Sequence, residues 1–261
     1  MKRKYFRNLT AFMICFTLAL NISGISISAQ TISDNVQLYS AKLETTCVSG
    51  DMMIGNVYYS TGIIHIKDLG TSKNVTVHYT YNGNDWFDQP AVYVETLSDG
   101  SQVWRYRTPN QSFMGCRYTK CNCRFAIKYE VNGNTYWDNN NGNDYFLERG
   151  KDSNYSPIVL SKSDITLDDI LSCGENKYSL NICLKNLGYD KTVKVRYTTD
   201  NWQTYNESEA SYNNTNANGI ENWATIIDVK RDFEFFIGYT VNGATYWDNN
   251  FELNYRLYNM D

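Results

Sequence analysis

Residues 129–140 read YEVNGNTYWDNN and residues 239–250 read YTVNGATYWDNN, so one twelve-residue string occurs twice with two differences. The match extends backwards from the string, because residues 74–80 (NVTVHYT) resemble residues 192–198 (TVKVRYT). The two copies lie further apart than the roughly 20–50 residues of a solenoid repeat. The sequence therefore predicts a duplicated domain, with one copy in each half of the chain.

The segments around the string alternate between apolar and polar residues. Val193, Val195 and Tyr197 occupy every second position of 192–198, and this period is typical of a half-buried β-strand. The strand that enters the second string follows the same rule and leaves Phe236 on its polar face. A large aromatic side chain on a polar face is not explained by packing of the core.

Turn residues separate the predicted strands. Each string contains an Asn-Gly pair, which favours a tight hairpin because both residues tolerate positive φ. Strands at this spacing, without helical periodicity, are typical of an antiparallel β-sandwich. We therefore predict an all-β chain with two sandwich domains, 36–147 and 158–258. The polar stretch 148–157 is the predicted linker between them.

The N-terminal segment has the order of a secretory signal peptide. Basic residues in 1–7 precede an apolar run over 9–20, and small residues follow up to Ala29. The alternative is a retained membrane anchor, but polar residues end the run below the roughly 18–20 residues that a span needs. We expect cleavage of 1–29 and a secreted or cell-surface protein, with no membrane span in the mature chain.

Composition excludes some partners. The net charge is −4, from 24 basic and 28 acidic residues, and no basic stripe is present. Nucleic acid is therefore not an expected partner. The chain is rich in aromatic residues, with 22 Tyr and 6 Trp. Tyr is common in strands, so this excess is informative only where an aromatic ring faces solvent.

Six cysteines remain after the predicted cleavage, and an even number in an exported protein favours disulfides. Cys173 and Cys183 flank the first hairpin of the second copy, and we expect them to pair. The first copy holds four more, whose pairing the sequence leaves open: Cys47, Cys116, Cys121 and Cys123. Zinc binding by those four is the alternative, although their spacing matches zinc sites poorly.

The stretch 138–144 (DNNNGND) resembles a calcium-binding loop in composition. Its glycine is not at the position that an EF-hand requires, and no glutamate closes it. We therefore expect neither a metal nor a cofactor. Asp138 and Asp248 are instead expected to bond nearby backbone in their turns.

The run from Lys-Asn-Leu-Gly through Val-x-Val-x-Tyr and Asn-Trp to Tyr-Trp-Asp-Asn-Asn resembles the family 21 carbohydrate-binding module. The resemblance covers nearly all of 158–258 and, more loosely, 36–147. It implies an immunoglobulin-like β-sandwich fold, which agrees with the strand pattern. It also implies binding of starch, glycogen or other α-1,4-glucans.

Glucose offers a weakly polar CH face and a rim of hydroxyls, so a binding site needs exposed aromatic rings and short amides. In the second copy the resemblance assigns the main site to five residues: Trp202, Phe236, Trp247, Asn249 and Asn254. It assigns a second site to Tyr189, Lys191 and Glu221, with Tyr212 as a candidate second aromatic. The alternative for the tryptophans is a place in the core, because buried Trp is common in sandwiches.

The first copy departs from this pattern. Trp86, Trp137 and Asn139 are retained, whereas Asp144 replaces the second amide. Ala126 stands where the second copy has Phe236, and Thr71 stands where it has Tyr189. We expect the first copy to bind more weakly or to prefer a different chain geometry.

These observations predict a non-catalytic, monomeric α-glucan-binding protein with maltooligosaccharides as small ligands and secreted amylases as candidate partners. Tandem sites would add avidity. The alternative is an adhesin or scaffold whose aromatic faces bind a protein. A glycosidase usually needs two carboxylates across a cleft, which the repeated motif does not offer, so no catalytic residue is assigned. A phosphatase-targeting role is the remaining alternative, but 194–197 (KVRY) resembles a docking motif only superficially.

Overall fold

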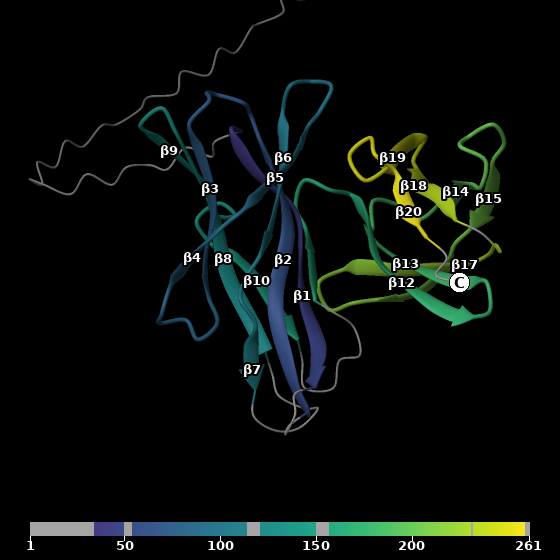
Figure 1. Cartoon of the computed structure of the whole chain (residues 1–261), viewed down its shortest axis with the longest axis horizontal. Helices are drawn as coiled ribbons and strands as arrows, with labels where there is room; N and C mark the ends of the chain where they lie inside the picture. Colours follow the sequence, from purple (N-terminus) through teal and green to yellow (C-terminus); the bar gives the residue numbers. More distant parts are fainter. Residues whose placement is uncertain (1–33, 50–53, 114–120, 150–156, 231, 259–261) are drawn as a thin grey trace, which may run out of the picture. The chain divides into compact units, whose positions relative to one another are not determined.

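The computed structural model describes residues 34–49, 54–113, 121–149, 157–230 and 232–258. Within these ranges no helix is long and apolar enough to cross a membrane. The predicted signal peptide lies outside the described residues. The described residues from Asp34 onward belong to one compact unit, and every strand pair among them is antiparallel (Figure 1).

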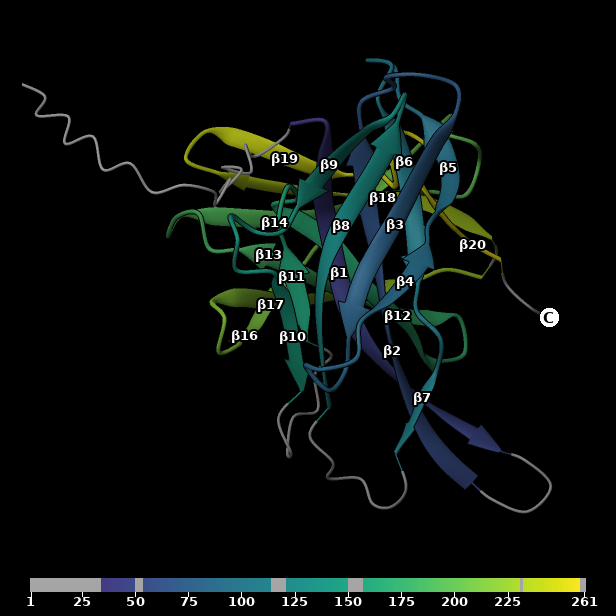
Figure 2. The ribbon, with the colours of Figure 1, turned by 90° about the vertical axis from the view of Figure 1, so that its left-hand side faces the viewer.

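The first module consists of two sheets. One has the strand order β11-β1-β2-β6-β5 with β7 beside β2, and the other has the order β10-β8-β3-β4 with β9 beside β8. Figure 2 shows β8, β3 and β4 side by side. The strands are β1 (Val36–Ser49), β2 (Ile54–Ile66), β3 (Lys73–Thr80), β4 (Phe87–Pro90), β5 (Val92–Thr96), β6 (Gln102–Arg107), β7 (Gln111–Phe113), β8 (Cys121–Val131), β9 (Asn134–Asp138), β10 (Tyr145–Arg149) and β11 (Ile158–Leu160).

The second module repeats this plan. One sheet has the order β12-β13-β17-β16, and the other has the order β15-β14-β18-β19 with β20 beside β18. The strands are β12 (Ile165–Gly174), β13 (Lys177–Lys185), β14 (Lys191–Thr198), β15 (Asn206–Glu209), β16 (Ser211–Thr215), β17 (Ile220–Asp228), β18 (Phe233–Val241), β19 (Ala244–Asp248) and β20 (Tyr255–Leu257). The pair β14–β18 therefore corresponds to β3–β8.

Each module has a hydrophobic core between its sheets. In the first, Val75, Val77 and Tyr79 of β3 are buried, as the alternation predicts. In the second, Val193 and Val195 of β14 are buried in a separate core cluster. The prediction of two immunoglobulin-like antiparallel β-sandwiches is confirmed. β11 follows the predicted linker, yet it pairs with β1 of the first module.

The repeated string forms a hairpin in both modules. Asn132 and Gly133 have φ values of 52° and 76°, and Asn242 and Gly243 have values of 50° and 77°. Positive φ at both central residues is the geometry of a type I′ turn. The amide of Asn132 also donates to Leu69 O at 2.7 Å. The turn thus fixes the preceding loop as well as the hairpin register.

The aspartate of each string joins the two sheets of its module. Asp248 accepts hydrogen bonds from Leu167 N at 2.6 Å and from Tyr255 Oη at 2.9 Å. It also accepts one from Asn250 N at 3.3 Å, the kind of nearby backbone bond expected from the sequence. Burial is the main cause of the raised pKa of Asp248. Asp138 binds Leu38 N and Tyr145 in the same way.

The predicted disulfide between Cys173 and Cys183 is wrong. Both thiols are free, with Cys173 exposed and Cys183 buried. Cys183 lies opposite Thr166 in the β12–β13 ladder, whereas Cys173 lies near the hairpin turn, beyond Ser172. Cys183 is further from the turn than Cys173 is, so the two cysteines are not opposite each other in the ladder. The side chains of Cys47 and Cys116 lie outside the described residues, and burial raises the pKa of Cys123 to about 12.

Candidate functional site

Three aromatic rings meet on the outer face of the β14–β18 sheet. Trp202 follows β14, Phe236 lies on β18, and Trp247 lies on β19. Trp202 stacks on Phe236 with the ring centroids 5.2 Å apart and the planes at 26°. Trp247 meets Phe236 edge-on at 5.5 Å and 71°. We call these three residues the second-module platform; it presents aromatic surfaces at an angle.

A loop in an uncommon conformation holds Trp202 in this platform. Its φ is 64°, in the left-handed region, and the backbone N–H of Trp202 donates to Thr198 Oγ1 at 3.1 Å. The indole Nε1 donates to Glu234 Oε2 at 2.9 Å. Asp200 organises the same loop, and hydrogen bonds from the hydroxyl and the amide of Thr204 lower the pKa of Asp200 to about 2. The loop is therefore held by side chains rather than by a sheet ladder.

A groove runs along the strands next to the platform. Its volume is about 230 Å³, and it is lined by Phe236, Trp247, Arg196 and Glu207, among others. Arg196 donates to Glu207 Oε1 at 2.7 Å. Trp247 is 52% exposed, so the core alternative for this residue does not apply. The platform and the groove together offer apolar faces with charged hydrogen-bonding groups alongside.

The two asparagines of the predicted main site shape the loop after β19. Asn249 O accepts from Asn254 N at 2.7 Å, and Asn249 Oδ1 accepts from Glu252 N at 3.1 Å. Asn254 has a φ of 56°. Both residues are half-buried. Their hydrogen bonds thus fix the loop that follows Trp247 and β19.

A second polar and aromatic cluster lies on β14, β16 and β17. Lys191 Nζ and Glu221 Oε1 are 2.8 Å apart, and their side chains are only 6% and 7% exposed. Trp223 Nε1 donates to Glu221 Oε2 at 2.9 Å, and Tyr212 meets Trp223 edge-on at 5.9 Å and 78°. Tyr189 is 96% exposed. The buried ion pair therefore fixes the indole of Trp223, and Tyr189 and Tyr212 are the exposed aromatic side chains.

Sequence reasoning missed Trp223. Period-two alternation along β17 places it on the same face as Glu221, and this signal was present in the sequence. The cross-strand register places Tyr212 directly opposite Trp223. The contact between the rings of Tyr212 and Trp223 could not be predicted from the sequence, because it depends on this register.

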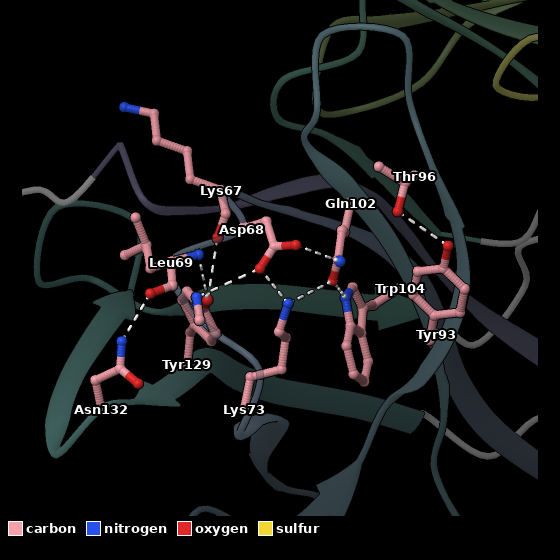
Figure 3. A network of polar contacts seen from close by, with 11 residues as sticks. Lys67, Asp68, Leu69, Lys73, Tyr93, Thr96, Gln102, Trp104, Tyr129 and Asn132 are labelled. Atoms are coloured by element: carbon pink, nitrogen blue, oxygen red, sulfur yellow. Dashed lines mark hydrogen bonds and ion pairs between the residues drawn. The ribbon is translucent and has the colours of Figure 1, made fainter.

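The first module contains a corresponding cluster, in which the neutral Gln102 takes the place of Glu221 (Figure 3). Lys73 contacts Asp68 and Gln102, with 3.3 Å from Lys73 Nζ to Gln102 Oε1. Trp104 Nε1 donates to Gln102 Oε1 at 3.2 Å, and Tyr93 meets Trp104 edge-on at 5.9 Å and 80°. The hydrogen bond from Lys73 is the main cause of the lowered pKa of Asp68. Thr71 replaces Tyr189 in the first copy, which argued against a second site there, but the hydrogen bonds among the lysine, the acceptor and the indole recur.

The main site of the first module has a different central ring. Trp86 stacks on His78 at 4.7 Å and 11°, and Trp137 meets His78 edge-on at 5.9 Å and 81°. The sequence places Ala126 where the second copy has Phe236, and sequence reasoning did not single out His78. Asn139 and Asp144 again close the following loop, with Asp144 N donating to Asn139 O at 2.8 Å.

Comparison with known proteins identifies the family. The sequence profile of the carbohydrate/starch-binding module (family 21) matches residues 30–148 and 160–258. The chain belongs to this family. The resemblance seen in the sequence is thereby confirmed, and each sandwich is a family 21 module.

Two curated relatives illustrate the range of the family. The chain is 31% identical over 104 residues to protein phosphatase 1 regulatory subunit 3C of Bos taurus. This alignment covers 37% of this chain and 32% of the relative. The chain is 29% identical over 141 residues to glucoamylase 1 of Rhizopus oryzae, covering 53% of this chain and 20% of the relative. The chain thus spans a third or less of these relatives.

Solved structures also match single modules. One is the starch-binding domain of Rhizopus oryzae glucoamylase in complex with β-cyclodextrin and maltoheptaose, at 30% identity and a TM-score of 0.33. The match covers 37% of this chain and 94% of that domain. Another is the carbohydrate-binding module of the muscle glycogen-targeting subunit of protein phosphatase 1, at 26% identity and a TM-score of 0.34, covering 37% of this chain and 76% of that module.

Proposed function

We propose that this protein is an exported, non-catalytic α-glucan-binding protein that uses two family 21 modules on one chain. The observation that carries the proposal is the second-module platform, in which Trp202, Phe236 and Trp247 face outward at an angle. Aromatic rings contact the CH faces of sugars at low entropic cost. Two surfaces set at an angle fit a curved α-1,4-linked chain better than a flat β-linked one.

The acidic residues of the repeated string support a role in structure rather than catalysis. Asp138 and Asp248 accept hydrogen bonds from backbone amides and from tyrosine hydroxyls. A glycosidase uses one carboxylic acid and one carboxylate on opposite sides of the scissile bond. These two aspartates are committed to holding sheets together, so binding without hydrolysis is the function that their environment favours.

The N-terminal sequence supports export, because 1–29 has the order of a signal peptide. An exported protein would meet starch or glycogen outside the cell, where secreted amylases are the enzymes that it would serve. Two modest sites on one chain raise the apparent affinity for a polymer by about 10²–10⁴-fold when both can engage it. A monomer is therefore sufficient for tight binding.

The phosphatase-targeting alternative is less favoured by the residues of β14. Val195 is fully buried in the core of the second module, so the segment 194–197 does not present this side chain to a partner. The relatives that carry this role share only part of their length with this chain. A protein partner on the aromatic face remains an outcome of the test below.

Isothermal titration calorimetry of the mature chain with maltoheptaose and β-cyclodextrin tests the proposal. Cellohexaose, a β-1,4-glucan, is the matched control ligand. We expect binding of the α-linked sugars alone, and a loss of about tenfold or more when Trp202→Ala and Trp247→Ala are combined. Release of reducing sugar from soluble starch would contradict the non-catalytic assignment. Absence of binding to both α-linked sugars would overturn glucan binding and favour a protein ligand.

A further inference from the structure

His78 takes the place in the first module that Phe236 holds in the second, although the two residues lie on non-equivalent strands. In the second module the directly opposed residues are Arg196 of β14 and Phe236 of β18. The corresponding pair in the first module is His78 of β3 and Ala126 of β8. The aromatic ring has therefore moved from one member of the cross-strand pair to the other.

The central ring keeps the same two contacts despite this exchange. In both modules it stacks on the tryptophan of the loop, at 4.7 Å in the first and 5.2 Å in the second. In both it meets the tryptophan of the hairpin edge-on, at 81° and 71°. Directly opposed residues have Cβ atoms about 4.5–5.5 Å apart, so a ring on either residue can reach both indoles.

Neighbouring charges fix the imidazole of His78 in this position. Its Nδ1 lies 2.6 Å from Asp88 Oδ1 of β4. Asp88 Oδ2 in turn accepts from Lys128 Nζ of β8 at 3.2 Å. Ala126 is buried and small, so it leaves space over β8 for the ring. The His78 side chain is 36% exposed, and the stack with Trp86 faces solvent.

We propose that His78 is the third carbohydrate-contacting ring of the first module, and that this module binds α-glucan through Trp86, His78 and Trp137. The inference rests on the proposed function and deepens it, because it restores to the first module a site that Ala126 would otherwise interrupt. In the second module the same position on β14 holds Arg196, which has no aromatic ring; its guanidinium binds Glu207 and lies over the ring of Tyr205.

The first experiment uses the whole chain without substitutions. The protein has only two histidines, His65 and His78, so the imidazole signals in a carbon–proton NMR spectrum can be followed individually. We expect addition of maltoheptaose to shift the ring signals of His78 and to leave those of His65 in place. A His78→Phe variant assigns the two sets. Unchanged His78 signals at a saturating concentration of the sugar would overturn the inference.

The second experiment removes the second-module platform with Trp202→Ala and Trp247→Ala and measures calorimetric binding of maltoheptaose in that background. Adding His78→Ala should lower the remaining affinity by about tenfold, whereas His78→Phe should keep most of it. The swap His78→Arg with Ala126→Phe, which copies the second module, should also retain binding. Circular dichroism confirms that each variant is folded.

The outcomes separate this inference from the proposed function. If the unaltered chain binds no α-glucan, the proposed function fails and the inference fails with it. If the unaltered chain binds but His78→Ala has no effect in the background described, only the inference fails. The matched control in the second module is Arg196→Ala, tested in a chain that carries Trp86→Ala and Trp137→Ala. Arg196→Ala should lower the affinity for maltoheptaose less than Phe236→Ala does in the same background.

Discussion

Trp247 packs directly on the backbone of Gly238, which lies opposite it in the β18–β19 ladder. A Cβ atom on Gly238 would lie 2.7 Å from Cζ3 of the indole, closer than real contacts allow. The absence of a side chain at Gly238 therefore allows the Trp247 indole to pack against the strand. In the first module the opposed pair is Lys128 and Trp137, so that indole has a different support.

Replacing Gly238 with alanine should displace the Trp247 indole and weaken maltoheptaose binding by about tenfold, because the edge-on contact with Phe236 would be lost. Calorimetric titration measures the change. Ile226→Ala, a substitution at an exposed site on β17, is the control and should leave affinity unaltered. An unaltered affinity in Gly238→Ala would mean that the indole position does not matter for binding.

The second prediction concerns Glu234, which accepts the hydrogen bond from Trp202 Nε1 and forms an ion pair with Arg256 at 2.5 Å. Glu234→Ala removes the acceptor and should free the Trp202 indole, lowering glucan affinity several-fold. Glu234→Gln keeps an acceptor oxygen and should bind nearly as well as the parent chain. Near-ultraviolet circular dichroism and titration with maltoheptaose report on the indole and on the affinity.

Asp228→Ala, which removes an exposed carboxylate on β17, is the matched control for a change in net charge. The interpretation would be wrong if Glu234→Gln and Glu234→Ala weakened binding equally. That result would assign the effect to charge near the platform instead of to the position of Trp202.

Much of the fold and of the second module's site could be predicted from the sequence. Alternation and Asn-Gly turns are local signals, so they located the strands and the hairpin of each repeated string. Phe236 could be found because a large ring at an outward position breaks the alternation. Trp202 and Trp247 followed from the resemblance to the family.

Other features depend on which residues face each other across strands, and a single strand pattern does not contain that register. His78 is one such case, because only the pairing with Ala126 shows that it replaces Phe236. The wrong disulfide between Cys173 and Cys183 has the same cause. The burial of Glu221 also depends on its distant partner Lys191.

The third prediction tests the buried ion pair of Lys191 and Glu221. Removing one member of a buried pair leaves an uncompensated charge, which typically costs about 3–5 kcal/mol. Lys191→Met should therefore lower the free energy of unfolding by about that amount, whereas the double variant Lys191→Met with Glu221→Leu should lose less. Urea denaturation followed by tryptophan fluorescence measures both. The pair is also expected to position Trp223.

Lys194→Met is the matched control, because Lys194 forms an exposed pair with Glu207 at 3.3 Å. Its effect on stability should be far smaller, since exposed pairs contribute little. If Lys191→Met and Lys194→Met had the same effect, the buried pair would not be a determinant of stability.

The last prediction concerns His65, which stacks on Tyr39 at 4.6 Å and meets Phe251 edge-on at 5.2 Å. Burial is the main cause that lowers the pKa of His65 to about 4. His65 takes up a proton near pH 6.5 in the unfolded chain. In the folded chain it takes up a proton only near pH 4. The stability that neutral His65 contributes is thus present above pH 6.5 and lost as the pH falls towards 4, by about 2–3 kcal/mol.

His65→Phe keeps a ring between the same neighbours and removes the titrating group. We expect the parent chain to lose stability relative to this variant between pH 7.5 and pH 4.5, as measured by urea denaturation at a series of pH values. Other groups titrate in both proteins, so the difference between the two curves isolates His65. Parallel curves over this range would show that the folded chain protonates His65 as easily as the unfolded chain does, and the imidazole would then have to be accessible to water.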